Sequence, residues 1–413
     1  MLGQGYVGLS VAMRAVEVGF DVVGFDPDTE RIGQLRAGES RVHDVDPERL
    51  LRALRSGRFH PTTRAEDIAL FDIAVIAVPT PILEGIPDLT FVESAAATLA
   101  SFVRPGSTVV LESTTFPGTT DALLVPLLEQ RSKLRAGRDF FVGYSPERID
   151  PGNDEWTFQR IPKIVSGIDD ASLRSVKAFY NRLVDRTVVV SGTREAELAK
   201  LLENTFRQVN IALVNEMAIV AHALGIDVWE SIDAASTKPF GYLRFVPGPG
   251  VGGHCVPVDP SYLSWHVERI LGIPFRCIEL AADINNQMPY HVVRRIQALL
   301  NDRRRSVNGS RVLVFGLAYK ANTGDSRESP AIRVCRELLR LGAEVLAADP
   351  HVAEASVPVG VTRVEGSVVD LATADLVAFL VDHDEFDRDA IGSIEVPVFD
   401  CRHVLKGPTV HYL

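Results

Sequence analysis

The sequence has few cysteines, no long apolar run and no basic patch. Its four cysteines, Cys255, Cys277, Cys335 and Cys401, form no C-x-x-C pair, which argues against zinc sites, iron–sulfur clusters and disulfide frameworks. Apolar stretches stay below the roughly eighteen residues of a transmembrane helix, and no signal-peptide pattern is present. We therefore predict a soluble, cytoplasmic protein without a metal site.

Positive charge is also scarce, because 43 Lys and Arg residues against 54 Asp and Glu residues give a formal net charge of −11. The short run Arg303–Arg305 falls at the end of a predicted helix, where cations are favourable in any case. These features argue against nucleic acid and anionic membranes as partners. An anionic small molecule stays compatible with them, since such a site needs only a few local donors.

The 413 residues suggest two or three domains, and strands alternate with helices at both ends of the chain. Buried apolar strands separated by helices predict parallel, doubly wound sheets, so we expect an α/β fold with two Rossmann-like domains. The expected strands of the first half are Val22–Phe25, Ile73–Val78, Thr108–Leu111, Phe140–Gly143 and Thr187–Val190. Those of the second half are Arg311–Phe315, Glu344–Ala348, Ala374–Phe379 and Pro397–Phe399, and the clearest helices are Leu9–Val18, Thr90–Phe102 and Pro330–Leu341.

Between the two α/β halves, from Glu195 to about Asn301, the pattern is helical. A long helix is expected to run toward Leu224, with Gly225 as its C-terminal cap. One face of this helix is apolar and the opposite face is polar. The apolar face carries Leu198, Leu201, Leu202 and Val209, and the polar face carries Glu197, Lys200, Asn204 and Gln208.

A dinucleotide fingerprint opens the chain. Gly3-Gln4-Gly5-Tyr6-Val7-Gly8 fits G-x-G-x-x-G and leads into a helix, and the next strand ends at Asp26. The glycines allow a tight turn and close approach of the backbone to a pyrophosphate, while Asp26 would bind the ribose 2′-hydroxyl and favour NAD over NADP. Three turn glycines in a domain that binds something else are the alternative. Only Met1 and Leu2 precede Gly3, so either the start is assigned too late or the sheet lacks its usual first strand.

A Gly/Pro-rich loop, Val246–Pro260, surrounds Cys255. Its irregular backbone would bring the thiol close to a ligand, and a helix expected to start near Pro260 would supply a local dipole. Cys255 is therefore the candidate nucleophile. We give His254 no catalytic role, and we expect Cys277, Cys335 and Cys401 to be structural.

Several motifs together resemble the UDP-glucose/GDP-mannose dehydrogenase family, and in particular its UDP-N-acetylhexosamine 6-dehydrogenase branch. The resemblance covers nearly the whole chain. It rests on Gly3–Leu9, Glu112–Gly118, Tyr144–Arg148, Glu197–Leu201 with Asn204, Gly252–Cys255 with Asp259, Gly316–Lys320 and Thr323–Ser329.

This resemblance implies three domains: an NAD-binding domain over residues 1–193, a central helical domain over 194–302 and a UDP-sugar-binding domain over 303–413. It also implies a homodimer through the central helix and a four-electron oxidation of a C6 hydroxyl that uses two NAD molecules. The Cys255 thiolate would add to the aldehyde, and the thiohemiacetal would become a thioester that water hydrolyses to the uronic acid.

The same resemblance assigns the site residues. Lys200 would stabilise the alkoxide-like oxygen, with Asn204 one turn further on, while Asp259 and Thr114 would position a water, and Glu147 would assist hydrolysis. Without the resemblance, each has an ordinary structural explanation; Glu147, for example, would be a surface acid and Asp259 a helix cap. The remaining expected contacts are those to NAD from Gly3, Gly5, Tyr6, Val7, Gly8, Asp26, Thr80, Thr114 and Arg327, and those to the substrate from Glu147, Arg148, Lys200, Asn204, Gly252, Gly253 and Lys320.

The chain departs from the UDP-glucose enzymes where they often have a second Glu four residues after Glu147, because Pro151 stands there. Tyr144–Arg148 and Val256–Asp259 are more similar to the N-acetylhexosamine branch. UDP-N-acetylglucosamine or another UDP-N-acetylhexosamine is therefore the preferred substrate, with UDP-glucose as the alternative.

Two other interpretations stay open. A β-hydroxyacid dehydrogenase would share the Rossmann domain and the Lys/Asn pair, but it needs neither the cysteine loop nor a second α/β domain. A catalytically silent nucleotide-sugar-binding protein would bind UDP-sugars without forming NADH. A short-chain epimerase or dehydratase is excluded, since no tyrosine has a lysine four residues later.

Overall fold

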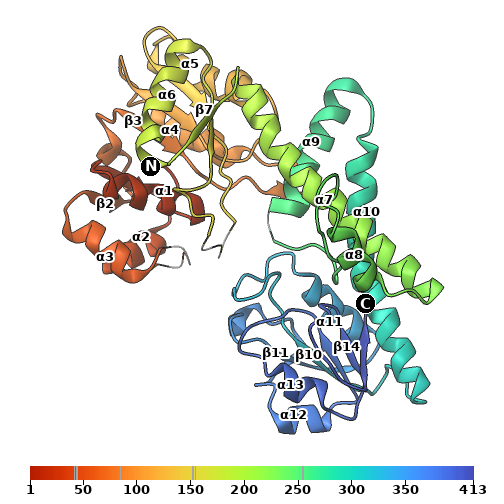
Figure 1. Cartoon of the computed structure of the whole chain (residues 1–413). Helices are drawn as coiled ribbons and strands as arrows, with labels where there is room; N and C mark the ends of the chain where they lie inside the picture. The colour runs from red at the N-terminus through yellow and green to blue at the C-terminus, as the bar shows by residue number, and fades with distance from the viewer. Residues whose placement is uncertain (41, 43–44, 84, 151–152, 154, 254) are drawn as a thin grey trace. The chain divides into compact units, whose positions relative to one another are not determined.

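The computed structural model describes residues 1–40, 42, 45–83, 85–150, 153, 155–253 and 255–413, with only the backbone of Cys255 (Figure 1). The chain divides into two compact units, Met1–Glu203 and Asn204–Leu413. Each unit is built around a parallel sheet, and each is described by itself.

The sheet of the first unit is made of short parallel strands. β1 pairs with β2, and β3, β6 and β7 form a second group, while β8 pairs with β9. Buried Val, Ile and Leu residues dominate these strands, as expected for a sheet that helices cover on both faces. The bounds are β1 Val22–Phe25, β2 Phe59–Thr62, β3 Ile73–Ile76, β6 Thr108–Leu111, β7 Phe141–Tyr144, β8 Lys163–Val165 and β9 Thr187–Val189, and a small hairpin adds β4 Ile82–Leu83 and β5 Ile86–Pro87.

The first residues of the chain occupy the position of the usual first strand. Leu2 forms parallel bridges to Phe25 of β1 and to Ile76 of β3. Its N–H donates to Val75 O at 2.8 Å, and its carbonyl accepts from Ala77 N at 2.9 Å. The two strand groups are thus joined in the order β2, β1, Met1–Gly3, β3, β6, β7, which is the Rossmann order 3-2-1-4-5-6. The sheet therefore has its first strand, although in a very short form.

Helices connect these strands and supply the covering layers. α1 has Gly5 at its N-cap and buries an almost continuous run from Gly8 to Val16 against the sheet. Its hydrophobic neighbours include Ile32, Leu35 and Leu50 from the next two helices. The bounds are α1 Tyr6–Glu17, α2 Thr29–Ala37, α3 Pro47–Arg55, α4 Thr90–Ala100, α5 Val125–Ser132 and α6 Asp170–Leu183, with short 3₁₀ or π turns at Ala65–Ile68 and Thr120–Leu124.

A long helix, α7 (Thr193–Leu224), crosses from the first unit into the second. It ends as predicted at Leu224, followed by Gly225 with a φ of +71°. Its burial pattern departs from the usual amphipathic rule, because the polar face of the helix is the buried one. Lys200 and Asn204 are only 8% and 5% exposed, whereas Leu202 is 63% exposed. This inversion is typical of a helix whose polar face lines a functional site.

The sheet of the second unit has six parallel strands in the order β12-β11-β10-β13-β14-β15. This is again the doubly wound order 3-2-1-4-5-6. Along β10, Val312 and Val314 pack into one hydrophobic cluster, and Leu313 and Phe315 pack into another on the opposite face. The bounds are β10 Arg311–Phe315, β11 Glu344–Ala348, β12 Thr362–Arg363, β13 Leu376–Phe379, β14 Val398–Asp400 and β15 Val410–Tyr412.

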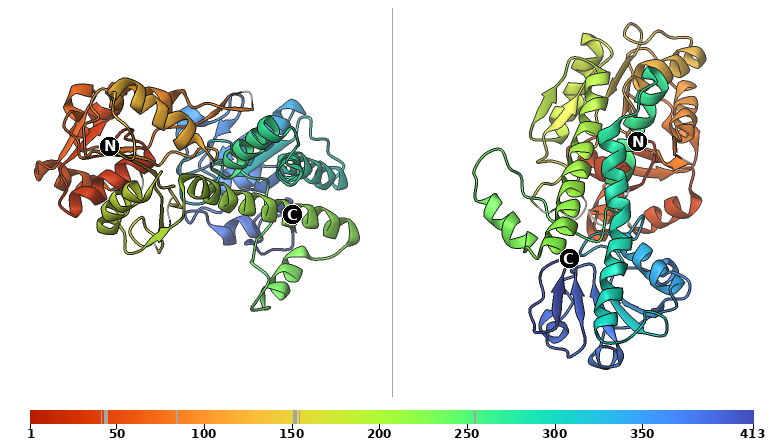
Figure 2. Two further views of the ribbon diagram at one scale, coloured as in Figure 1. Left: turned by 90° about the horizontal axis from the view of Figure 1, so that it is seen from above. Right: turned by 90° about the vertical axis from the view of Figure 1, so that its right-hand side faces the viewer.

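The helices of the second unit form two groups. A hairpin of two long helices stands beside the second half of α7, and the longer of them, α10, continues along the sheet (Figure 2). Residues Met288, Val292 and Ile296 of α10 belong to the core on one face of the sheet. The bounds are α8 Val228–Ser236, α9 Cys255–Leu271, α10 Arg276–Asp302, α11 Pro330–Arg340, α12 Val368–Thr373 and α13 Arg388–Gly392, with a 3₁₀ turn at Glu354–Ser356.

The predicted α/β fold with two Rossmann-like sheets and a long central helix is confirmed. One local expectation was wrong. α9 begins at Cys255 and not near Pro260, so Asp259 lies inside the helix and is not its cap. Cys277 is exposed, whereas Cys335 and Cys401 are buried. Among the described residues, none of the helices combines the length and apolarity that crossing a membrane requires.

Candidate active site

The three fingerprint glycines meet three different requirements. Gly3 has a φ of +86°, and a Cβ there would lie 2.3 Å from Ala77 O. A Cβ on Gly8 would collide with the carbonyl of Gly3 at 1.9 Å. A Cβ on Gly5 would meet no described protein atom within 4 Å, so the fold itself does not require glycine there.

The open side of Gly5 fits a dinucleotide. Gly5 is the N-cap of α1, and no side chain caps the helix, so its first turn, with Tyr6 and Val7, offers the positive end of the helix dipole to an anion. A pyrophosphate needs close backbone approach at this point. The residues present therefore fit NAD at the N-terminus of α1.

Asp26, directly after β1, is buried and already oriented. Its carboxylate accepts hydrogen bonds from Gln4 N at 2.8 Å and from Asp28 N at 3.0 Å. Arg31 of α2 forms an ion pair with it at 2.8 Å. Arg31 was not predicted, although its position in the first turn of the helix after Asp26 was a usable signal. Thr80, another predicted NAD contact, is buried in the loop after β3.

A buried carboxylate ties the loop after β6 to α7. Glu197 accepts hydrogen bonds from Gly118 N at 2.5 Å, Thr120 N at 2.8 Å and Thr120 Oγ1 at 2.7 Å. Burial raises the pKa of Glu197 to about 7, although these three donors lower it. Glu197 lies one turn before Lys200 on α7 and so fixes the loop that carries Thr114, which is half-buried. This anchoring role was not predicted.

Lys200 and Asn204 occupy successive turns on the buried polar side of α7. Within the described part of the first unit, no carboxylate lies within salt-bridge distance of Lys200, so this buried ammonium is not held by an acid there. In the second unit, Asn204 Nδ2 donates to Asp259 Oδ2 at 2.5 Å. Asn204 and Asp259, two of the predicted site residues, are thus joined directly, and Asp259 is 1% exposed.

Glu147 is not the surface acid that its loop position alone would predict. Its Oε2 accepts from Lys163 Nζ at 2.9 Å, and its Oε1 accepts from the backbone N–H groups of Arg148 and Ile149, both at 2.7 Å. The neighbouring Arg148 guanidinium pairs with Glu203 at 2.6 Å and donates to a backbone carbonyl. In this structure Arg148 thus holds the loop to α7, and Glu147 has a defined orientation.

The thiol loop of the second unit packs against the loop after β10. A Cβ on Gly252 would lie 2.8 Å from Tyr319 Cβ, and one on Gly253, whose φ is +81°, would lie 2.9 Å from the Tyr319 ring. Gly253 N also donates to Arg327 O at 3.0 Å. The structure therefore brings together two motifs that are distant in the sequence. Lys320 follows Tyr319 and is half-buried, while Arg327 is exposed and paired with Asp325 at 2.6 Å.

A ladder of buried amides holds the same loop from the other side. Asn215 of α7 accepts from Gly248 N at 2.9 Å and donates to Asn285 of α10 at 2.9 Å, and Asn285 donates to Gln208 O at 3.2 Å. Such residues in helices have no distinct sequence signature, and the sequence analysis missed them.

Arg402, in the loop after β14, lies beside the same glycine. A Cβ on Gly248 would be 3.1 Å from Arg402 Nη1. Burial lowers the pKa of Arg402, so its guanidinium carries a charge in a poorly solvated place. A half-buried cation next to a Gly/Pro-rich loop suits an anionic ligand, and Arg402 was not among the predicted residues.

Cys255 is the first residue of α9, where the helix dipole favours a thiolate. His254 lies outside the described residues. The buried cysteines are in the opposite situation, because burial raises the pKa of Cys335 to about 12 and that of Cys401 even higher. Only the helix start at Cys255 thus offers the setting of a nucleophile among these three.

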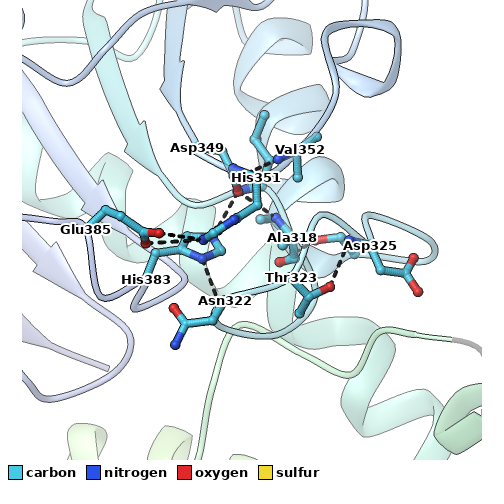
Figure 3. A network of polar contacts seen from close by, with 12 residues as sticks. Ala318, Asn322, Thr323, Asp325, Asp349, His351, Val352, His383 and Glu385 are labelled. Carbon is cyan, nitrogen blue, oxygen red and sulfur yellow. Dashed lines mark hydrogen bonds and ion pairs between the residues drawn. The ribbon is translucent and has the colours of Figure 1, made fainter. Parts of the chain in front are cut away.

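A second polar cluster in the C-terminal sheet contains His351, His383 and Glu385 (Figure 3). Their ligand atoms lie within 4.8 Å of one another. However, His383 Nδ1 accepts from Asn322 N at 3.0 Å, so its Nε2 carries the proton and donates to Asp349 at 3.1 Å. Both ring nitrogens are in use, and the network stabilises the fold.

A pocket of about 360 Å³ lies where α7 ends and α8 begins, and its lining includes His222, Trp229, Arg295 and Tyr412. Within the described part of the chain, none of the predicted site residues lines it. We therefore assign it no part in the reaction.

Comparison with known proteins matches all parts of the chain to one family. Models of the NAD-binding, central and UDP-binding domains of the UDP-glucose/GDP-mannose dehydrogenase family match residues 1–184, 194–287 and 313–407. The chain belongs to this family. The predicted enzyme class, an NAD-dependent nucleotide-sugar dehydrogenase, and the predicted NAD cofactor are thereby confirmed.

Similar proteins include dehydrogenases of several UDP-sugars. The structure of a UDP-D-ManNAc dehydrogenase from Pyrococcus horikoshii is 33% identical, with a TM-score of 0.90 and coverage of 100% of this chain and 97% of the other. A UDP-glucose dehydrogenase structure from Pyrobaculum islandicum is 31% identical, with a TM-score of 0.88 and coverage of 100% and 95%. The UDP-N-acetyl-D-glucosamine 6-dehydrogenase of Pseudomonas aeruginosa is 36% identical over 98% of this chain and 96% of its own.

Proposed function

We propose that this chain oxidises the C6 hydroxyl of a UDP-N-acetylhexosamine, with UDP-N-acetylglucosamine preferred, to the uronic acid. NAD, when bound, takes a hydride from C6 in each of two successive oxidations. Relatives named for N-acetylmannosamine and N-acetylglucosamine substrates support this class of sugar, while the Pyrobaculum enzyme keeps UDP-glucose as the alternative.

The observation that carries the proposal is the position of Cys255 at the N-terminus of α9, in a glycine loop held by three separate contacts. A thiolate there would add to the C6 aldehyde to give a thiohemiacetal, and oxidation of that adduct would give a thioester. Water then cleaves the C–S bond and returns the thiol. This sequence keeps the aldehyde bound between the two oxidations.

The chain's other residues prepare and finish these steps. Lys200 would stabilise the C6 oxygen as it loses its proton, because the ammonium is buried and unpaired by any described acid of its unit. Asn204, Asp259 and Thr114 would position a water, supported by the bond between Asn204 and Asp259. Glu147, held as an oriented carboxyl, would assist hydrolysis.

The remaining predicted residues would bind the two ligands, NAD and the UDP-sugar. Gly3, Gly5, Tyr6, Val7, Gly8, Asp26, Thr80 and Thr114 would bind NAD together with Arg327, and Arg31 joins them through its ion pair with Asp26. Arg148, Gly252, Gly253 and Lys320 would contact the UDP-sugar, and Arg402 beside Gly248 adds a cation for the diphosphate. The three-domain division at 193/194 and 302/303 remains part of this proposal.

A homodimer through α7 is also proposed. The outward face of this helix carries a stripe of exposed apolar side chains at spacings of three, four and seven residues. Its members are Leu198, Leu202, Phe206, Leu213, Met217, Val220 and Leu224. Sedimentation analysis is expected to give a dimer that Met217→Glu together with Leu213→Glu dissociates.

The test is an assay of purified protein with NAD and UDP-N-acetylglucosamine, UDP-N-acetylgalactosamine, UDP-N-acetylmannosamine or UDP-glucose. We expect about two NADH per sugar and a carboxylate product by mass spectrometry. Cys255→Ser should abolish turnover, and Lys200→Met should lower kcat by about a hundredfold or more. Binding of a UDP-sugar without any NADH would favour the silent binding protein instead.

A further inference from the structure

The N-terminal unit buries a group of charges that the proposed chemistry uses only in part. Lys163 at the start of β8 is 2% exposed, and its ammonium lies between two carboxylates. One is Glu147 at 2.9 Å, and the other is Glu112, directly after β6, at 2.7 Å. Glu112 is 1% exposed and the Glu147 side chain is 12% exposed, so the group holds two carboxyls around one cation.

The two carboxyls are held very differently. Glu147 accepts two backbone N–H bonds besides Lys163, so both of its oxygens have a hydrogen-bond donor. Glu112 Oε1 accepts from Lys163 and from Tyr180 Oη, the latter at 2.7 Å, while its Oε2 has no partner among the described residues. Glu112 is therefore the carboxyl of the pair that is protonated first when the pH falls.

The electrostatics of the group agree with this order. Burial raises the pKa of Glu112, and the nearby Glu147 adds to that rise, although Lys163 and Tyr180 lower it. For Glu147, burial alone would raise the pKa, but Lys163 and the two backbone donors reverse the effect and leave it below the ordinary value. Among the described groups, Lys163, Glu112 and Tyr180 are the titratable ones that face Glu147, because the Arg148 guanidinium turns to Glu203.

We propose that Glu112 is a positioning residue that, by sharing Lys163, sets the basicity of Glu147 in thioester hydrolysis. A carboxylate paired one-to-one with a buried ammonium is a weak base, since its proton affinity is reduced by the full opposite charge. When Glu112 is ionised, Lys163 divides its attraction between two anions, and Glu147 can take a proton from water. When Glu112 is protonated, the Lys163 ammonium is paired with the Glu147 carboxylate alone, and Glu147 is then the weaker base.

The step itself is balanced without any further reagent. The water oxygen forms a bond to the thioester carbonyl carbon, the C–S bond breaks, and Cys255 leaves as a thiolate. The water proton passes to Glu147, and nothing is oxidised or reduced. This inference rests on the proposed function, because it needs Glu147 to act in hydrolysis.

The experiment follows hydrolysis as the decay of the thioester adduct once it has formed. Wild-type enzyme is mixed with NAD and UDP-N-acetylglucosamine, or with whichever sugar of the panel is turned over, quenched at successive times, and the thioester adduct is followed by protein mass spectrometry from about pH 6 to 9. Two nearly isosteric variants are compared, Glu112→Gln and Tyr180→Phe. Both keep Lys163 and Glu147, and thermal unfolding checks that each remains folded.

The two variants are expected to shift the profile in opposite directions. Glu112→Gln fixes the one-to-one pair, so the plateau rate should fall about tenfold and the acidic limb should move to lower pH. Tyr180→Phe removes a donor that favours ionised Glu112, so the limb should move to higher pH while the plateau is kept. If Glu112 and Tyr180 had only a structural role, each variant would lower the hydrolysis rate without moving the acidic limb of its pH profile.

The outcomes separate the inference from the function on which it rests. Opposite shifts of the acidic limb in Glu112→Gln and Tyr180→Phe support the inference. If all three proteins form and hydrolyse the thioester with the same pH profile, the inference is wrong and the proposed function stands. If Cys255→Ser still gives two NADH and the acid, the covalent route itself fails.

Discussion

The two parallel sheets have the same strand order. They differ at one corner, which consists of the glycine turn after the first strand and the aspartate after the second. In each unit a glycine turn follows the first strand, and an aspartate follows the second: Gly3 and Asp26 in one, Gly316 and Asp349 in the other. Each aspartate accepts hydrogen bonds from the turn and from the residue two positions after itself. The corner is thus repeated down to its hydrogen bonds.

The two corners differ in the side chain that contacts each aspartate. Asp26 is met by Arg31, whose side chain is 42% exposed, so the corner faces the surface and can admit a ribose. Asp349 is met by His383, which is fully buried, and it also accepts from Ala318 N and Val352 N (Figure 3). One corner is open to a ligand and the other is closed by the protein itself. A Rossmann sheet therefore does not define a dinucleotide site unless this corner is left open.

The largest expected effect comes from breaking the closed corner. Asp349→Ala removes the acceptor for four backbone N–H groups and for His383, so we expect unfolding of the second unit to become easier by about 3–5 kcal/mol. Chemical denaturation followed by circular dichroism measures it. A loss below about 1 kcal/mol would mean that water replaces these bonds and that the corner is not closed.

Glycine substitutions sharpen the same contrast. Gly316 has a φ of +87°, and a Cβ there would lie 2.3 Å from Val381 Cβ, so Gly316→Ala should cost about 2 kcal/mol or more in stability. Gly5→Ala should leave the melting temperature nearly unchanged, since nothing described lies within 4 Å, but should raise the KM for NAD about tenfold or more. If Gly5→Ala destabilised the fold and left NAD binding intact, the open corner would not be the cofactor site.

Much of this arrangement could be predicted from the sequence, because local signals specify it. The strands Val22–Phe25, Thr108–Leu111, Arg311–Phe315 and Glu344–Ala348 were predicted with their observed bounds. Apolar runs between glycines identify strands, whatever the rest of the chain does. Asn204 and Asp259 could be assigned to the site only from the family resemblance, and the hydrogen bond between them was not predicted.

Other features depend on contacts between distant residues, and no local pattern reports them. Met1–Gly3 form a strand only because β1 and β3 supply partners on both sides. The start of α9 at Cys255 was missed because Pro260 suggests a helix start, although here it lies within the helix. The buried polar face of α7 and the Glu112–Lys163–Glu147 group likewise follow from tertiary packing.

A smaller effect is expected at the open aspartate. Asp26→Asn keeps the shape but loses the charge that pairs with Arg31 and selects a ribose hydroxyl. We expect the KM for NAD to rise about tenfold, the preference over NADP to shrink, and kcat to stay nearly unchanged. Steady-state kinetics with both cofactors measure it, with Asp28→Asn as a nearby control. An unchanged ratio of NAD to NADP use would show that Arg31 and the turn, not Asp26, select the cofactor.

The smallest expected effect is the acid sensitivity that the closed corner gives to the fold. Burial alone would raise the pKa of Asp349, but the bonds from His383 and the backbone reverse this and leave it well below the ordinary value. A carboxyl with a lowered pKa in the folded state stabilises the protein above its unfolded pKa, and that contribution is lost as the pH falls below about 4. Denaturation at about pH 3 and at pH 7 should therefore show a steeper acid loss for the wild type than for Asp349→Asn, which has no such group to titrate. An equal loss of unfolding free energy in the two proteins would mean that Asp349 has the same proton affinity in the folded and unfolded chain. Its hydrogen bonds would then stabilise the protonated carboxyl as well as the carboxylate.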